Sequence, residues 1–367
     1  MNIPYINLAL QHQTIKQELL SAAEKILASG QFILGDEVKK FEERFAKIAG
    51  TKYAVGVDNG TDALVLALKA LGIGKGDEVI TAPNSFLASA SSIALVDAKI
   101  VFADVCEDFN LNPVKVEKAI TKRTKAIIAV HLTGRPADME ALQKICKKNK
   151  IHLIEDCAQA VSAEYNGKRV GSFGIIGCFS LHPLKNLSAA GDGGVLTTNS
   201  EKIYRWLIKA RNHGLKNRDE CDFWSMNSRL DNLQAAFLNV KLNYFEQWTN
   251  RRREIAALYY SKLNGLDMII PCDNEKEKAV YHTFIIQTKY RDELKKFLAD
   301  NGVDTKVHYP IPIHCQKAAK YLGYRKGSFP ITEKQAKTIL SLPVYPELTD
   351  EQVLFVCNKI QEFYSKK

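Results

Sequence analysis

Several signatures are absent from this chain of 367 residues. Its eight cysteines form no CxxC pair and its eight histidines occur in no HExxH pattern, so two common types of metal or redox motif are excluded. No apolar stretch is long enough to span a bilayer, and the N-terminus has no basic-then-apolar signal segment. We therefore expect a cytoplasmic protein with reduced thiols, no membrane contact and no bound metal.

Charge and composition narrow the class of protein further. Lys and Arg number 51 against 41 for Asp and Glu, and this surplus is scattered along the chain. A scattered surplus suits a small anionic ligand better than a nucleic acid, which a basic track would bind. The hydrophobic content of 46% and the charged content of 25% are typical of a globular enzyme, and no repeat or low-complexity segment occurs.

Short apolar segments alternate with helical patterns along most of the chain. Seven of them have the length and composition of strands, near residues 53, 79 and 101 and at 125–131, 151–154, 177–180 and 194–198. Strands that alternate with helices predict an α/β protein whose mainly parallel sheet is covered on both faces.

The pattern changes near residue 245, and a chain of this length exceeds what one compact core usually supports. We therefore divide it into an N-terminal arm at 1–35, a large domain at 36–245 and a smaller C-terminal domain at 246–367. Four further elements are predicted, namely an amphipathic helix at 13–27, a long bridging helix at 232–263, a strand at 281–286 and a helix at 291–300.

Lys185 is the most distinctive candidate for chemistry. It lies five residues after Ser180, which ends an apolar strand, and it is flanked by apolar residues and Pro183 before a glycine-rich turn at 191–194. This context predicts a fixed, partly dry lysine rather than a solvated surface charge. A desolvated lysine loses its proton more readily and becomes a nucleophile toward an aldehyde.

Two acids, Glu155 and Asp156, end the apolar run at 151–154. Ligands in open α/β sheets bind at the carboxyl ends of the strands. A carboxylate there can hold a metal, pair with the protonated pyridine nitrogen of pyridoxal phosphate, or simply begin a helix, where acids are favoured. Asp156 is our candidate for the pyridine nitrogen, and Gln159, one helical turn later, is our candidate for the ring hydroxyl of the same ligand.

The third candidate feature is an anion site. A strand at 52–57, a turn at 58–62 and a helix at 63–71 follow one another, and the amides and dipole of a helix N-terminus favour an anion. Gly60 permits close backbone approach and Thr61 supplies a hydroxyl. The string GxxxxGK[ST] is absent, so this turn is not a P-loop.

Taken in order, these motifs resemble the DegT–StrS family of sugar aminotransferases, within the fold-type I pyridoxal-phosphate enzymes. The similar segments extend over nearly the whole chain, at 35–38, 60–64, 76–80, 84–86, 131–134, 155–159, 183–187, 191–194, 211–214, 227–231 and 308–310. The resemblance implies an aspartate-aminotransferase-like fold, with a large, mainly parallel mixed sheet flanked by helices and a smaller α+β C-terminal domain. It also implies pyridoxal 5'-phosphate as the cofactor.

The resemblance implies cofactor contacts for individual residues. Lys185 would be the catalytic residue and form the Schiff base, while Asp156 and Gln159 would hold the pyridine nitrogen and the ring hydroxyl. The cofactor phosphate would be bound by Gly60, Thr61 and Ser180. Phe86 would lie over the ring face, unless it is an ordinary core residue.

The remaining implied contacts concern the partner chain and the substrate. Asn227 would reach the cofactor phosphate of a neighbouring subunit, which implies a homodimer with shared active sites. His182, Arg229, His308 and Tyr309 would contact the sugar, although Arg229 is equally suited to a structural ion pair. His182 stands where the family often has a tyrosine, which puts the choice of substrate in doubt.

The function that this resemblance implies is transfer of an amino group from glutamate to a nucleotide-linked keto-deoxysugar, as in deoxyamino sugar and polysaccharide biosynthesis. Relatives with histidine in place of Lys185 catalyse a dehydration instead, so the lysine favours transamination. The segment at 185–194 is more similar to enzymes that act at C3 than to those that act at C4. Amination at C4, a non-catalytic pyridoxal-phosphate-binding regulator, and a nucleotide hydrolase with Glu155 and Asp156 as a metal-binding pair stay open as alternatives.

Overall fold

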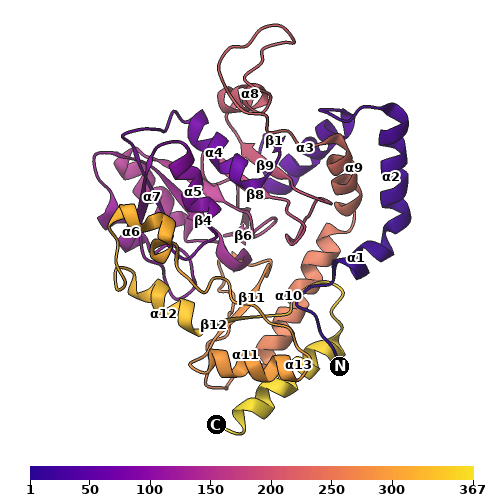
Figure 1. Cartoon of the computed structure of the whole chain (residues 1–367), viewed down its shortest axis with the longest axis vertical. Coiled ribbons are helices and arrows are strands. Elements are labelled where there is room, and N and C mark those ends of the chain that lie inside the picture. The colour runs from indigo at the N-terminus through magenta and orange to yellow at the C-terminus, as the bar shows by residue number, and fades with distance from the viewer.

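The computed structural model describes residues 1–367, and a seven-stranded sheet forms its centre (Figure 1). Its strands are β1 (Tyr53–Val57), β2 (Glu78–Thr81), β3 (Lys99–Phe102), β4 (Thr124–Val130), β5 (His152–Asp156), β8 (Ile176–Ser180) and β9 (Gly194–Thr198). They lie in the order β1-β9-β8-β5-β4-β2-β3, and only β9 runs antiparallel to its neighbours, β1 and β8. The predicted mainly parallel mixed sheet is confirmed.

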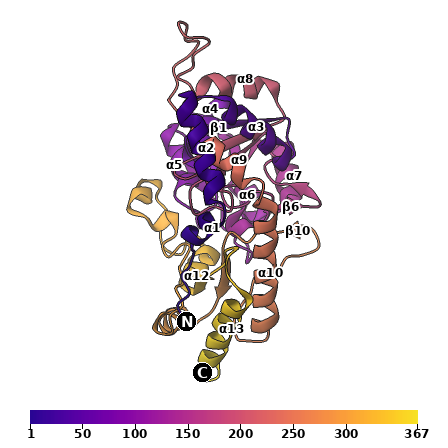
Figure 2. The same ribbon diagram turned by 90° about the vertical axis from the view of Figure 1, so that its right-hand side faces the viewer.

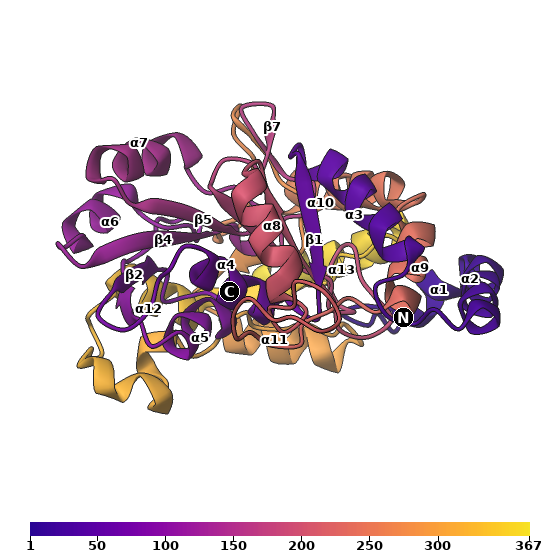
Figure 3. The same cartoon turned by 90° about the horizontal axis from the view of Figure 1, so that it is seen from above.

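Both faces of this sheet are buried, as the continuous apolar character of its strands predicts. Along the central strands, Val79 and Ile128 join one apolar core, whereas their sequence neighbours Ile80 and Ile127 join another on the opposite face. Figure 3 shows α6 (Pro113–Ala119) and α7 (Met139–Asn149) on one side of β4, with α4 (Gly60–Ala70) and α5 (Ala88–Leu95) on the other. The other helices between residues 36 and 245 are α3 (Asp36–Ala49), the 3-10 turn η1 (Leu132–Gly134), α8 (Glu201–Ala210) and α9 (Asn232–Lys241).

The C-terminal region has its own core around a two-stranded antiparallel sheet of β11 (Phe284–Gln287) and β12 (Ile339–Leu342). Its helices are α10 (Phe245–Leu263), α11 (Arg291–Asp300), η2 (Ile313–Cys315), η3 (Lys317–Leu322), α12 (Pro330–Thr338) and α13 (Asp350–Tyr364). A small third sheet, made of β6 (Glu164–Tyr165), β7 (Lys168–Arg169) and β10 (Glu277–Lys278), joins this region to the loop after β5. None of the helices combines the length and the apolar character needed to cross a membrane.

The N-terminal segment contributes to both parts of the molecule. Ile3 is fully buried in the core of the C-terminal region and pairs with Val303. The helices α1 (Leu8–Thr14) and α2 (Lys16–Ser29) follow, and α2 packs against α9 (Figure 2). Conversely, two residues of the C-terminal region, Ile313 and Phe329, pack in the apolar core of the large sheet. The division at residues 35 and 245 therefore stays a proposal, with apolar contacts across both boundaries.

Three helix and strand predictions need correction. The helix predicted at 13–27 is split at Ile15, whose ψ of 14° leaves the helical region while its side chain is buried. The long helix predicted at 232–263 is interrupted after Lys241, so α9 and α10 are separate. The predicted strand at 281–286 begins only at Phe284, because Tyr281 has a left-handed φ of 45° that no strand accommodates.

Gly177 in β8 allows a neighbouring loop to lie directly on the strand that leads to Ser180. A Cβ atom added at Gly177 would lie 2.6 Å from both the Cα of Gly171 and the Oγ1 of Thr197. Real Cβ atoms do not approach other atoms so closely, and here two of the three nearest atoms belong to backbone. The packing of the 171–174 loop against β8 thus requires glycine at this position.

We expect the substitution Gly177→Ala to lower the free energy of unfolding by at least about 2 kcal/mol, because the methyl group forces β8 and the loop apart. Urea titration followed by circular dichroism would measure this change. Gly74→Ala is the matched control, since a Cβ atom there meets nothing closer than 3.5 Å. Equal stability of the two variants would show that the close packing at Gly177 is not required.

Candidate functional site

One cavity of about 610 Å³ lies between the carboxyl ends of β5 and β8 and the C-terminal region. Most of the residues predicted for the site line it, namely Gly60, Thr61, Phe86, Asp156, Gln159, Ser180, His182, Lys185, His308 and Tyr309. Asn227 and Arg229 do not. The structure thus gathers residues from distant parts of the chain around one space, while their contacts with a ligand stay predictions.

Lys185 follows β8 in a turn closed by the hydrogen bond from its own amide to the carbonyl of His182, at 2.8 Å. Burial lowers the pKa of its amine to about 8, and the negative charge of Asp156 opposes this shift. A larger fraction of the amine than in an ordinary lysine is therefore unprotonated near neutral pH, as a nucleophile toward an aldehyde requires. The predicted partly dry environment of Lys185 is what the structure shows.

Asp156 is held in a fixed orientation at the end of β5. The hydroxyl of Ser89 donates to its Oδ2 at 2.7 Å, and the amide of Ala158 donates to its Oδ1 at 3.1 Å. The side chain is buried and accepts both bonds as a carboxylate does, so it suits a cationic partner inside the cavity. No pattern in the sequence marks Ser89, because only the tertiary contact between α5 and β5 distinguishes it from the neighbouring serines.

The N-terminus of α4 borders the cavity next to Ser180. A Cβ atom at Gly60 would lie 2.7 Å from the Cβ of Ser180, so only glycine allows this close approach. Asn59 caps the helix through the amide of Asp62, and the hydroxyls of Thr61 and Ser180 border the same cavity. A phosphate fits this combination of free amides, helix dipole and hydroxyls.

Aromatic and amide side chains also line the cavity. Phe86 is 54% exposed although it is a large apolar residue, so the alternative that it is an ordinary core residue is not supported. Its ring centroid lies 5.8 Å from that of Tyr309. Gln159 accepts a hydrogen bond from the amide of Thr133 at 2.7 Å, and its side chain lines the cavity.

His308 enters the cavity from the C-terminal region. Its Nδ1 lies 2.9 Å from the Oγ of Ser341, and its ring packs against Tyr5 of the N-terminal segment at 5.6 Å between centroids. Burial, followed by the positive charges of Lys185 and Lys306, lowers the pKa of His308 to about 4. The imidazole is therefore neutral at physiological pH and offers hydrogen bonds rather than charge.

Asn227 and Arg229 lie outside the cavity of their own chain. Asn227 is exposed in the segment before α9, where it pairs with Asn212, and Arg229 donates to the Oδ1 of Asn212 at 2.9 Å. This position agrees with a structural role for Arg229 within one chain. Contacts of either residue with a second chain or with a substrate stay predictions.

The metal-binding alternative for the acid pair is not supported, because Glu155 already has a complete set of donors. Its Oε1 accepts from the amides of Phe173 and Gly174 at 2.8 and 2.7 Å, and its Oε2 accepts from the amide of Gly171 at 2.8 Å. His131 completes the set, with its Nε2 at 3.1 Å from the same Oε2. Although His131, Glu155 and Cys157 are close enough to hold an ion, the carboxylate has no free position for one.

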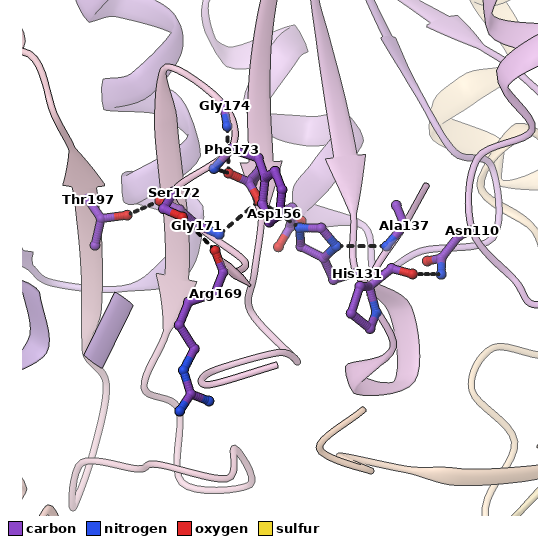
Figure 4. Close-up of polar contacts among 12 residues, drawn as sticks. Asn110, His131, Ala137, Asp156, Arg169, Gly171, Ser172, Phe173, Gly174 and Thr197 are labelled. Atoms are coloured by element: carbon purple, nitrogen blue, oxygen red, sulfur yellow. Dashed lines mark hydrogen bonds and ion pairs between the residues drawn. The ribbon is translucent and has the colours of Figure 1, made fainter. Parts of the chain in front are cut away.

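The tautomer of His131 follows from its other neighbour (Figure 4). The amide of Ala137 donates to Nδ1 at 3.0 Å, so the ring proton lies on Nε2 and points at Glu155. Glu155 thereby connects the segment after β4, the end of β5 and the loop before β8. Asp156 and Ser180, which both line the cavity, lie on the two strands that this carboxylate connects.

We expect Glu155→Gln to lower the free energy of unfolding by at least about 2 kcal/mol, because the new amide group faces buried N–H donors and leaves them without an acceptor. Thermal and urea unfolding of the purified variant would measure the loss. Glu43→Gln is the matched control on the exposed face of α3. If the two variants unfold alike, the carboxylate of Glu155 does not hold the three segments together.

A family model, characterised relatives and solved structures all match nearly the whole length of the chain. A model of the DegT/DnrJ/EryC1/StrS aminotransferase family matches residues 13–361. A pleiotropic regulatory protein of Geobacillus stearothermophilus is 44% identical over 99% of each chain. A dTDP-3-amino-3,6-dideoxy-alpha-D-galactopyranose transaminase of Aneurinibacillus thermoaerophilus is 42% identical and covers 98% of this chain and 99% of its own. The crystal structure of S. venezuelae DesV, in complex with a ketimine intermediate, matches with a TM-score of 0.97 at 39% identity, covering 99% of this chain and 98% of that one.

Proposed function

The chain belongs to the DegT/DnrJ/EryC1/StrS aminotransferase family, and on that basis we propose that it is a pyridoxal-phosphate-dependent aminotransferase of nucleotide-linked 3-keto sugars. One observation carries the proposal. A lysine with a lowered pKa, a fixed buried carboxylate and a helix N-terminus that suits a phosphate border the same cavity. Pyridoxal phosphate has one group for each of them, namely an aldehyde, a pyridine nitrogen and a phosphate.

The residues of the cavity fit this cofactor. Lys185 would hold the aldehyde, Asp156 the protonated pyridine nitrogen, and Gly60, Thr61 and Ser180 the phosphate. Gln159 would bind the ring hydroxyl, and Phe86 would lie over the ring face. When bound, the cofactor supplies an electron sink for the carbanion that forms at the α-carbon of the amino donor.

The protein itself supplies orientation and proton transfer. The amine of Lys185, released when an amino donor binds, removes the proton from the α-carbon of the donor and later returns one, as general base and acid. Its pKa of about 8 lies close to physiological pH, where such transfer is most efficient. Asp156 keeps the pyridine nitrogen charged because Ser89 and Ala158 hold its carboxylate in place.

The substrate and the partner chain form the second part of the proposal. We infer glutamate as the amino donor and a nucleotide-linked 3-keto-deoxysugar as the acceptor, with support from the relatives named for 3-amino sugar products. The sugar would contact His182, His308 and Tyr309, and a second copy of the chain would bring Asn227 and Arg229 to the cavity. A homodimer with shared sites would explain why these two residues lie outside their own cavity.

One relative favours a second candidate function. The Geobacillus protein carries the name of a pleiotropic regulator, so a regulatory protein that binds pyridoxal phosphate without turnover is the competing proposal. The two differ in their response to an amino donor, since an enzyme converts the bound cofactor and a non-catalytic binder does not.

We expect the purified protein to develop a visible absorption with pyridoxal phosphate that bleaches when glutamate is added. Lys185→Ala should lose this imine absorption and slow transamination by at least about 100-fold, because both the covalent link and the general base are removed. Lys202→Ala, on the exposed side of α8, is the matched control and should behave as wild type. Full activity of Lys185→Ala would overturn the proposal.

A panel of nucleotide-linked 3-keto and 4-keto sugars distinguishes the substrate classes. We expect restoration of the bleached absorption, together with formation of an amino sugar detected by mass spectrometry, with 3-keto substrates. Restoration only by 4-keto substrates would support amination at C4. Stable colour without any response to glutamate or other amino donors would support the regulator.

A further inference from the structure

Lys241 is a buried lysine that the proposed reaction does not use. It is the last residue of α9, its side chain is fully buried, and it does not line the cavity. Burial lowers its pKa to about 8, and no carboxylate lies beside it to oppose this shift. Lysine is almost never fully buried without a partner, because removing an amine from water costs free energy. The burial of Lys241 therefore directs attention to the group that it binds.

That group belongs to the segment after Lys185, residues 186–190. The Nζ of Lys241 donates to the carbonyl of Ser188 at 2.8 Å and lies 3.3 Å from the Oγ of the same residue. Ser188 is itself buried. A charged donor forms a stronger hydrogen bond than a neutral one, and a buried carbonyl without a donor is unfavourable. The bond thus connects the end of α9 to the main chain three residues after Lys185.

Other contacts fix the same segment to distant parts of the chain. The Nδ2 of Asn186 donates to the carbonyl of Val280 at 3.0 Å, and the amide of Ala190 donates to the Oε1 of Gln234 at 2.7 Å. Leu187 is fully buried in a core that residues of α9 also form. Gln234 belongs to α9, so this helix supplies a second polar contact to the segment besides the buried amine.

Lys185 is held on its other side as well, since its amide donates to the carbonyl of His182 at 2.8 Å. It therefore lies between the end of β8 and a segment whose main chain is fixed from outside. We propose that Lys241 is a positioning residue, which holds the segment after Lys185 and thereby fixes the point from which the Lys185 amine enters the cavity. Its effect on the reaction with an aldehyde rests on the proposed function, whereas the anchoring is a property of the chain alone.

Three substitutions separate this role from a general loss of stability. Lys241→Met keeps most of the volume of the side chain but removes the donor, so the carbonyl of Ser188 is left unpaired. Lys241→Gln keeps an N–H donor on a shorter side chain and should lie between Lys241→Met and the wild type. Thr249→Val is the matched control, since it removes a buried hydroxyl that donates to the carbonyl of Phe245 at 2.9 Å within α10.

The first readout is amide hydrogen exchange of the full-length protein without cofactor, measured by mass spectrometry at neutral pH. The amides of Ala189 and Ala190 donate to Leu181 and Gln234, so their exchange reports opening of the segment. We expect Lys241→Met to accelerate it by at least about tenfold and Thr249→Val to leave it within about twofold of wild type. Unchanged exchange in Lys241→Met, or an equal acceleration in β4 and β5, would overturn the proposal.

The second readout separates the placement of Lys185 from the integrity of the cavity. Pyridoxal phosphate forms the imine absorption with the amine, whereas deoxypyridoxine phosphate has the same ring and phosphate but a methyl group in place of the aldehyde. We expect Lys241→Met to slow imine formation by at least about tenfold, because the amine no longer starts from a fixed position. The Kd for deoxypyridoxine phosphate should change by less than about twofold. Equal losses in both measurements would show a general structural role and overturn the positioning role.

The outcomes for the proposed function are distinct from these. A wild-type protein that forms no imine with pyridoxal phosphate would overturn the proposed function, and hydrogen exchange would then decide on the anchoring by itself. Imine formation at the wild-type rate in Lys241→Met would overturn the positioning role and leave the proposed function intact. If Lys241→Met does not fold, Lys241→Gln takes its place, with changes expected in the same direction in both readouts.

Discussion

A single buried carboxylate connects the segments from which the cavity is built. Glu155 accepts from the ring of His131 after β4 and from the amides of the 171–174 loop before β8, while its own strand carries Asp156. Parallel strands are hydrogen-bonded along their length, but nothing in the sheet itself fixes the segments beyond their carboxyl ends. Glu155, within β5, binds both the segment that leaves β4 and the loop that enters β8, so that Asp156 on β5 and Ser180 on β8 border one cavity.

The sheet was largely predictable because its strands are apolar on both faces and short. All seven predicted strands occur, and the helix predicted at 291–300 has the observed bounds. The errors fall where tertiary contacts override a continuous pattern. Ile15 interrupts a helical periodicity that runs through it, and a left-handed Tyr281 delays the strand at Phe284. Neither residue type signals a break, because isoleucine and tyrosine rarely adopt those conformations without support from neighbours.

From the residue pattern alone, the site was predictable only where its residues follow strand ends or helix starts, whereas Phe86, His308 and Tyr309 were predicted from the family resemblance. Asp156, Ser180 and Gly60 occupy such positions, and their chemistry suits a ligand at the carboxyl edge of a parallel sheet. Ser89, which donates to Asp156, and His282, which lines the cavity, could not be found in this way. One is a serine within a helix and the other lies far along the chain, and each reaches the site only through the folded structure.

The balance of charge inside the cavity defines what kind of ligand completes it. His308 and His282 are neutral because a cationic imidazole would lie in a partly dry space next to Lys185. The remaining features are one buried carboxylate, Asp156, one lysine of lowered pKa and the positive end of the α4 dipole, whereas the carboxylates of Asp62 and Asp192, which also line the cavity, are more exposed to solvent. An anion alone would bind the N-terminus of α4 but bring no cation to Asp156. A cation alone would pair with Asp156 but leave the N-terminus of α4 without an anion. A ligand with both a protonated ring and a phosphate pairs with Asp156 and with the N-terminus of α4 at the same time. If the ligand also carries an aldehyde, the amine of Lys185 can react with it and need not stay in the cavity as a buried ammonium.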